Sequence, residues 1–177
     1  MKINNYEERI GGILRELGAP PQRESSNWGL FPEAEELVSV GADIYGREQR
    51  LTPEAAAAWE AMRTAAEQDG ETLQLVSAFR SVDYQRGIIE RKLAAGQSWE
   101  KILRVSALPG YSEHHTGRTI DVTTPGSEAL EEEFESTSAF RWLQRRASEF
   151  GFTMTYPRGN KFGIAYEPWH WTLREGS

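Results

Sequence analysis

Histidine is scarce in this chain of 177 residues, and its three copies occupy only two short segments of the C-terminal half. His114 and His115 lie in the segment SEHHTGRTID, which ends at Asp121, and His170 lies in EPWHW, three residues after Glu167. Two imidazoles and one carboxylate are typical ligands of a divalent metal, and a spare carboxylate beside them completes the minimum of a hydrolytic zinc centre. A fold that uses these side chains together must bring the two segments to one point.

Cysteine is absent from the sequence, which excludes disulfide bonds and leaves only nitrogen and oxygen side chains to hold a metal. Hydrophobic residues make up 38% of the chain and charged residues 27%, the balance of a soluble globular protein. The length suits one hydrophobic core, so we expect a single domain over residues 1–177. The net charge of −7, without a dense cluster of lysine and arginine, argues against a nucleic-acid partner.

No stretch of the sequence approaches the length of apolar chain that spans a membrane. Glu7 and Glu8 stand where a signal peptide has its apolar core. We therefore expect a chain without a membrane span, cytoplasmic as it stands, or periplasmic or in the cell wall if a targeting segment has been removed. The sequence gives no indication of oligomeric state.

The first 50 residues are expected to form a helical and irregular segment. Apolar residues recur at helical spacing over residues 5–17, and the pattern stops at Gly18. Residues 18–50 are mixed in character and rich in turn formers, with Trp28, Leu30 and Phe31 as expected anchors to the core.

The sequence after residue 50 predicts alternating helices and strands. Thr52-Pro53-Glu54 is a helix start, and the alanine-rich run after it reaches about residue 68. Further helices are predicted after Ser81, over residues 99–105 and over residues 137–150. Strands are predicted around residues 73–76, 118–124, 152–155, 162–164 and 169–173. Because no regular βαβ repeat appears, we predict an α+β fold with a small, mostly antiparallel sheet and flanking helices.

The candidate ligands each have a plainer interpretation. Asp121 could be an ordinary polar residue on a strand, but aspartate is disfavoured in strands, and a turn around Gly117 could bring it to His114. His170 lies between two tryptophans in a predicted strand, so alternation puts the imidazole on one face and the indoles on the other, whether it is a ligand or a surface residue. His115 has the opposite parity to His114 and is expected to support the ligands or to point outward.

Two charged residues are candidates for catalysis. Glu167 could be a surface charge, but its place before Pro168 sets it close to whatever His170 binds, where it could move a proton during hydrolysis. Arg80 follows a predicted strand and could bind a substrate carboxylate or stabilise an oxyanion, unless it is an exposed loop arginine. Ser112 and Gln85 are further candidates for substrate hydrogen bonds, although a turn serine and a solvated glutamine are the plainer interpretations.

Three segments together resemble the zinc D-alanyl-D-alanine carboxypeptidases of the vancomycin-resistance type, within the lysostaphin, carboxypeptidase and hedgehog superfamily. They are Ser77-Ala78-Phe79-Arg80-Ser81 with Tyr84-Gln85, the segment from Ser112 to Asp121, and Glu167-Pro168-Trp169-His170. The resemblance covers about residues 70–175, the expected catalytic core. Two departures, Ala78-Phe79 for the usual glycine-tyrosine and Thr119 for a small alanine, bear on the shape of the pocket more than on the chemistry.

The resemblance implies a hedgehog and DD-peptidase-like fold and a role for each matching residue. His114, Asp121 and His170 would bind one zinc ion, and Glu167 would be the catalytic base. Arg80 would assist at the substrate, with Ser112 and Gln85 close by.

The implied activity is removal of a C-terminal D-amino acid from a peptidoglycan stem peptide or muropeptide. An L,D-carboxypeptidase or a phage endolysin that cleaves between L-alanine and D-glutamate would use the same chemistry. A non-catalytic zinc module that binds a peptide, as in the hedgehog branch, is a further alternative. Glu167 weighs against this last alternative, because a structural site would more naturally close its fourth position with a protein ligand.

Overall fold

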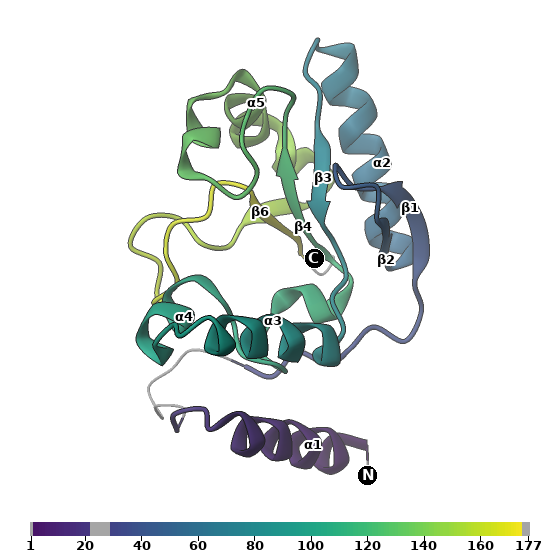
Figure 1. Cartoon of the computed structure of the whole chain (residues 1–177). Coiled ribbons are helices and arrows are strands. Elements are labelled where there is room, and N and C mark those ends of the chain that lie inside the picture. The colour runs from purple at the N-terminus through teal and green to yellow at the C-terminus, as the bar shows by residue number, and fades with distance from the viewer. Residues whose placement is uncertain (1, 22–28, 175–177) are drawn as a thin grey trace.

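The structure of the protein is a computed structural model that describes residues 2–21 and 29–174. Trp28, an expected anchor, lies outside these residues, while Leu30 packs with the apolar residues of α1. The described part is α+β, as predicted (Figure 1). Its helices are α1 (Lys2–Leu17), α2 (Pro53–Gln68), α3 (Val82–Ala94), α4 (Trp99–Val105) and α5 (Ser138–Arg146), with 3-10 turns η1 (Glu113–Thr116), η2 (Glu132–Ser136) and η3 (Ala147–Phe150).

The main sheet has four strands in the order β3-β4-β6-β5, and each neighbouring pair is antiparallel. These strands are β3 (Gln74–Ser77), β4 (Thr119–Thr123), β5 (Phe152–Met154) and β6 (His170–Leu173). A separate hairpin pairs β1 (Val38–Ala42) with β2 (Glu48–Leu51). The expectation of a mostly antiparallel sheet is therefore confirmed.

Apolar residues on one face of the sheet form the main core with α2 and α5. Ile120 and Val122 of β4 and Trp171 of β6 are buried there against Trp59 of α2 and Phe140 of α5. Side chains alternate between the faces of a strand, so Asp121, between Ile120 and Val122, and His170, next to Trp171, belong to the opposite face. The core thus fixes which face remains available for polar chemistry.

The predicted helix starts are present. The Thr52 hydroxyl accepts from the backbone N–H of Ala55 at 3.3 Å, and the Ser81 hydroxyl accepts from that of Tyr84 at 3.0 Å. Such caps satisfy N–H groups that have no partner inside the helix. They fix where α3 begins, directly after the Arg80 segment.

Three expectations need correction. The first 50 residues contain the β1–β2 hairpin in addition to helix and irregular chain, and polar residues in β2 concealed its pattern. The predicted helix over residues 137–150 is α-helical only in α5 and ends in the 3-10 turn η3. The strand predicted over residues 162–164 is wrong, because the Asn160 side chain accepts from the Phe162 N–H and donates to the Ile164 carbonyl, which makes a turn.

Helix α1 packs outside the main core. Ile10 and Ile13 contact Val82 at the start of α3 and form a second, smaller apolar cluster. Figure 1 shows α1 below α3, on the far side of that helix from the sheet. Among the described residues, no helix has both the length and the apolar character needed to cross a bilayer.

Candidate metal centre and active-site pocket

The antiparallel pairing of β4 and β6 places two of the candidate ligands side by side. Asp121 and His170 are direct register partners on the sheet face opposite the core. The Nδ1 atom of His170 lies 3.0 Å from Oδ1 of Asp121. Trp171 lies in the core, as alternation predicted, whereas Trp169 precedes β6 and lines the pocket as well as contacting the core. Tyr156 lies against His170, with ring centroids 4.6 Å apart, and limits the movement of the imidazole.

His114 reaches the same point from η1. Gly117 closes this turn with a φ of 63°, and a Cβ atom there would lie 2.9 Å from the Leu37 side chain, so glycine suits the position. The Nδ1 atom of His114 lies 2.6 Å from the Ala78 carbonyl, and its ring centroid is 5.1 Å from that of His170. The turn around Gly117 therefore brings His114 and Asp121 together, as the sequence suggested.

One nitrogen of His114 is buried without a hydrogen-bond partner. Burial, aided by the charge of Arg80, lowers the pKa of His114 to about 4, so the ring is neutral at pH 7. Since a carbonyl can only accept, Nδ1 carries the proton and donates it to Ala78, which leaves a lone pair on Nε2. That lone pair faces Oδ2 of Asp121 at 3.2 Å, an arrangement that is repulsive unless a cation lies between the two atoms.

The donor set fits a zinc ion. Ligand atoms of His114, Asp121 and His170 all lie within 4.8 Å of one another, and all three residues are buried. Two imidazole nitrogens and one carboxylate oxygen are protein ligands that zinc accepts, and three such ligands leave a coordination position open. The Nδ1–H donated by His114 to a backbone carbonyl is also the support that metal-bound histidines usually have.

The carboxylates around His170 determine its charge. Burial alone lowers the pKa of His170, but hydrogen bonds to Asp121 and Glu113 raise it to about 10. Burial opposes ionisation of Asp121, yet His114, Arg80 and the hydrogen bond with His170 outweigh it and hold the Asp121 pKa well below its usual value. The cluster without metal is therefore a protonated His170 between two carboxylates.

No role was predicted for Glu113, and the structure gives it a specific contact. Its Oε2 lies 2.9 Å from Nε2 of His170 and accepts the Thr172 hydroxyl at 2.8 Å. Burial raises the pKa of Glu113, but the interaction with His170 outweighs burial and lowers it to about 2. Glu113 thus fixes the orientation of the His170 ring and directs Nδ1 toward Asp121. The one sequence signal was an acid directly before a candidate ligand.

Glu167 lies at the edge of the cluster. Its Oε2 is 3.6 Å from Nδ1 of His170, and its side chain is 14% exposed. Burial raises the pKa of Glu167 to about 7, with a further rise from the charge of Asp121 against the lowering effect of His170. A carboxyl with a pKa near 7 can both accept and release a proton at neutral pH.

Arg80 and His115 are linked through backbone contacts. The Arg80 guanidinium lies 2.5 Å from Oδ2 of Asp121 and also donates to the Ser77 hydroxyl. His115 is fully buried, so the expectation that it might point outward is wrong. It donates from Nδ1 to the Arg80 carbonyl at 2.6 Å and accepts at Nε2 from the Gly110 N–H at 3.0 Å. His115 therefore supports Arg80 and the loop before η1.

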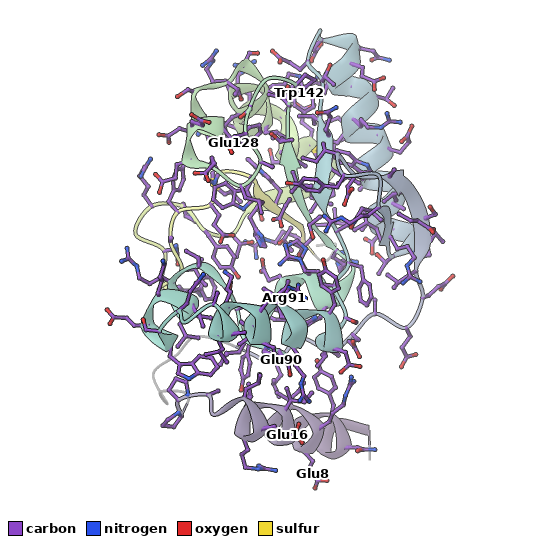
Figure 2. All side chains as sticks on the ribbon, viewed as in Figure 1. Glu8, Glu16, Glu90, Arg91, Glu128 and Trp142 are labelled. Atoms are coloured by element: carbon purple, nitrogen blue, oxygen red, sulfur yellow. The ribbon has the colours of Figure 1, made fainter. Side chains whose placement is uncertain are left out.

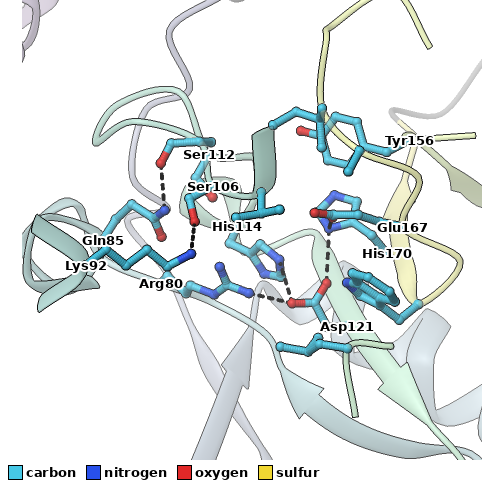
Figure 3. A pocket seen from close by; sticks show the side chains of 16 residues that line it. Arg80, Gln85, Lys92, Ser106, Ser112, His114, Asp121, Tyr156, Glu167 and His170 are labelled. Atoms are coloured by element: carbon cyan, nitrogen blue, oxygen red, sulfur yellow. Dashed lines mark hydrogen bonds and ion pairs between the residues drawn. The ribbon is translucent and has the colours of Figure 1, made fainter. Parts of the chain in front are cut away.

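The cluster opens into a pocket of about 280 Å³ (Figure 3). Arg80, Glu167 and the three metal-site residues line it, together with Ser112 and Gln85, so all of the predicted site residues meet in one cavity. Gln85 is 1% exposed and donates to the Ala107 carbonyl at 2.7 Å, while its Oε1 atom has no partner. Lys92 also lines the pocket, and sequence analysis did not identify it.

Comparisons with known proteins find similarity to carboxypeptidases. A family model described as "VanY: D-alanyl-D-alanine carboxypeptidase" matches residues 48–175. The putative carboxypeptidase YodJ of Bacillus subtilis is 36% identical over 172 residues, which is 95% of this chain. The chain spans 60% of the length of that relative.

Solved structures show the same fold. The LdcB LD-carboxypeptidase is 33% identical and matches with a TM-score of 0.71 over 80% of this chain and 69% of its own. A variant of the vancomycin-resistance D,D-pentapeptidase VanY, solved in complex with Zn(II), matches with a TM-score of 0.58. It is 23% identical, and the match covers 88% of this chain and 83% of that one. The predicted DD-peptidase-like fold is thereby confirmed.

Proposed function

The chain belongs to the VanY family of D-alanyl-D-alanine carboxypeptidases, and from this membership we propose that it is a zinc-dependent peptidase. Its proposed reaction is removal of a C-terminal D-amino acid from a peptidoglycan precursor or muropeptide. The observation that carries the proposal is the unpartnered Nε2 of His114, buried opposite Asp121 and His170 and beside the unligated carboxyl of Glu167.

Three atoms would hold the ion: Nε2 of His114, a carboxylate oxygen of Asp121, and Nδ1 of His170. Bound zinc supplies a Lewis acid that polarises the scissile carbonyl and lowers the pKa of water. Glu113 keeps Nε2 of His170 occupied, so Nδ1 is the atom that faces the cluster. His170 must lose its Nδ1 proton before that atom can act as a ligand.

Glu167 would act first as a general base and then as a general acid. Its carboxylate accepts a proton from the attacking water, whose oxygen forms a bond to the carbonyl carbon of the substrate. When the bond between that carbon and the amide nitrogen breaks, Glu167 returns the proton to the departing amine. The products are a shortened peptide with a new carboxylate and a free D-amino acid.

Arg80 would stabilise negative charge on the carbonyl oxygen during this reaction. Its side chain is 18% exposed, and its guanidinium lies in the pocket within 2.5 Å of Asp121. A planar, permanently charged donor held by Ser77 and by the backbone contact of His115 is suitably rigid for that role. Ser112 and Gln85 are proposed to bind the substrate through the pocket atoms that they expose.

A second candidate function is cleavage of an L,D-peptide bond. The LD-carboxypeptidase LdcB is 33% identical to this chain over the matched part, compared with 23% for the D,D-pentapeptidase structure. The same base and ligand set would serve either bond, so the difference must lie in the pocket walls. A non-catalytic zinc module remains the less favoured candidate, because Glu167 is partly buried without being placed as a fourth ligand.

The test compares the zinc-loaded protein with Glu167→Gln and with Glu128→Gln. Glu128 is an exposed residue in the loop after β4, outside the pocket (Figure 2). Each protein is given one peptide ending in D-Ala-D-Ala and one ending in L-Lys-D-Ala, and released D-alanine is measured by mass spectrometry. We expect Glu167→Gln to retain one zinc per chain and to lose at least about 100-fold in rate, with Glu128→Gln unchanged. Parent-like release by the zinc-loaded Glu167→Gln protein would refute the catalytic assignment.

A further inference from the structure

Lys92 is a partly buried cation in the pocket that forms no ion pair with any residue that the structure describes. It lies in the last turn of α3 and lines the same cavity as Arg80, Ser112 and Glu167. Its ammonium group donates to the Ser106 hydroxyl at 2.6 Å. Within the described part of the chain, no carboxylate lies close enough to Lys92 to form a salt bridge. Figure 3 shows Lys92 extending toward Ser106, on the side of the pocket where Arg80 and Gln85 lie.

Arg80, the neighbouring cation, does not provide an equivalent anion site, because its guanidinium already has partners. The Arg80 guanidinium is paired with Asp121 and hydrogen-bonded to Ser77. An ammonium group has three donors, and the contact with Ser106 uses one of them. A charge in partly buried surroundings is favourable only when an opposite charge or enough hydrogen-bond partners accompany it. Among the described side chains, the charge of Glu167 favours the charged form of Lys92 but forms no ion pair with it, so the ammonium can still take a directly bound anion.

A second unsatisfied atom lies in the same cavity. Oε1 of Gln85 is buried and has no hydrogen-bond partner, because Nε2 of the same amide is fixed on the Ala107 carbonyl. Oε1 can only accept, so its missing partner is an N–H or O–H group. The pocket thus pairs a cation that lacks an anion with an acceptor that lacks a donor. The C-terminal residue of a peptide offers both groups, a carboxylate and an amide N–H, a few atoms apart.

We propose that Lys92, held in place by Ser106, binds the terminal α-carboxylate of the amino acid that the enzyme removes, while Gln85 accepts a hydrogen bond from the peptide chain. The proposal rests on the proposed peptidase function and adds Lys92 as a residue that determines its selectivity for the free acid. Lys92 and the metal cluster line the same cavity of about 280 Å³, and in this proposal the departing residue lies between the cluster and the ammonium. An internal peptide bond, as an endopeptidase would cut, presents no carboxylate at that place.

The experiment measures binding separately from turnover. The zinc-loaded Glu167→Gln protein is titrated calorimetrically with diacetyl-L-Lys-D-Ala-D-Ala and with the same peptide as its C-terminal carboxamide. The variants Lys92→Met and Lys92→Arg are made in this background. Lys101→Met serves as the matched control, because Lys101 is an exposed lysine on α4 that does not line the pocket. The corresponding single variants with Glu167 intact are assayed for KM and kcat.

The expected result is a change in selectivity for the free acid. A charge-assisted hydrogen bond predicts that Lys92→Met weakens binding of the acid by roughly 10- to 100-fold and leaves binding of the amide unchanged. Lys92→Arg should keep the preference for the acid, and Lys101→Met should behave as the parent does. With Glu167 intact, Lys92→Met should raise KM for the acid more than it lowers kcat.

Two results would overturn the role of Lys92. The first is that Lys92→Met weakens binding of the acid and of the amide equally. The second is that the Glu167→Gln protein binds the acid equally well with and without Lys92→Met, or that neither protein binds it detectably. A different result would refute the proposed function alone. In that case the zinc-loaded parent releases no D-amino acid, while Lys92→Met still abolishes the binding preference for the acid over the amide. Conversely, hydrolysis of acid and amide at equal rates would leave the peptidase function standing and remove the carboxylate site.

Discussion

Zinc binding to the metal-free protein is expected to release about one proton per ion at pH 8.5, and this proton comes from His170. In the metal-free cluster, His170 lies between the carboxylates of Asp121 and Glu113, which raise its pKa to about 10. Its Nδ1 cannot bind a metal until that proton leaves. His114 contributes no proton, because burial lowers its pKa to about 4 and its Nε2 is already a free lone pair.

The magnitude follows from these pKa values. At pH 8.5, a pKa of about 10 leaves His170 about 97% protonated, whereas a pKa of about 7 leaves Glu167 about 3% protonated. The expected release is therefore about 1.0 proton per zinc. At pH 7.0, Glu167 is about half protonated, so release rises toward about 1.5 protons if the incoming charge also ionises this carboxyl. Between pH 7 and 9, the displaced His170 proton makes the apparent zinc affinity increase about tenfold per pH unit.

Calorimetric zinc titrations in buffers of different ionisation enthalpy measure the number of protons released. In Glu113→Gln, His170 loses one of its two carboxylate partners, which lowers its pKa. Proton release at pH 8.5 should therefore fall below that of the parent, whereas Glu128→Gln should match the parent. Zero release by the parent at pH 8.5 would contradict the reasoning, since it would mean that zinc binds without displacing the His170 proton.

Three further predictions concern stability. Because the pKa of Glu167 is raised to about 7, its ionisation opposes folding as pH rises from 4.5 to about 7. Glu167→Gln should therefore stabilise the metal-free chain by up to about 3 kcal/mol at pH 8 and by little below pH 4.5. Urea unfolding in the presence of a chelator measures this difference. Gly110→Ala would place a Cβ atom 2.8 Å from Ile10 at a φ of 87°, so amide exchange in α1 should accelerate more than exchange in the sheet. Phe140→Ala should cost about 3–5 kcal/mol in thermal unfolding without changing zinc stoichiometry, because Phe140 is buried in the core behind the sheet.

Local signals were sufficient for much of the fold. A hydroxyl before a helix and alanine-rich or amphipathic runs depend on neighbours in sequence, and Thr52 and Ser81 cap their helices as expected. The β1–β2 hairpin was missed because its stability depends on contacts that sequence does not display. Asp43 accepts the Tyr45 and Arg47 N–H groups and pairs with the Arg47 side chain, which closes the turn between β1 and the largely polar β2.

The residues of the site also divide into those that the sequence identified and those that it did not. The donor types and the resemblance of the motifs grouped His114, Asp121 and His170, and the turn at Gly117 and the β4–β6 register bring them together. Glu113 and Lys92 could not be assigned, because an acid and a lysine are ordinarily solvated and only the fold buries them against His170 and within the pocket. Residues whose function depends on the loss of solvent therefore remained unrecognised until tertiary structure was available.

The charges of the metal-free cluster connect zinc binding to the base. His170 and Arg80 together offset the two buried carboxylates Asp121 and Glu113, and under these conditions burial holds the pKa of Glu167 near 7. Replacing one proton on His170 by a divalent cation adds one positive charge within a few ångströms of Glu167. A nearby positive charge favours the ionised form of a carboxyl, so zinc binding would itself lower the pKa of Glu167. In the proposed mechanism, the same exchange that fills the ligand site would thus convert Glu167 into a carboxylate able to accept a proton at neutral pH.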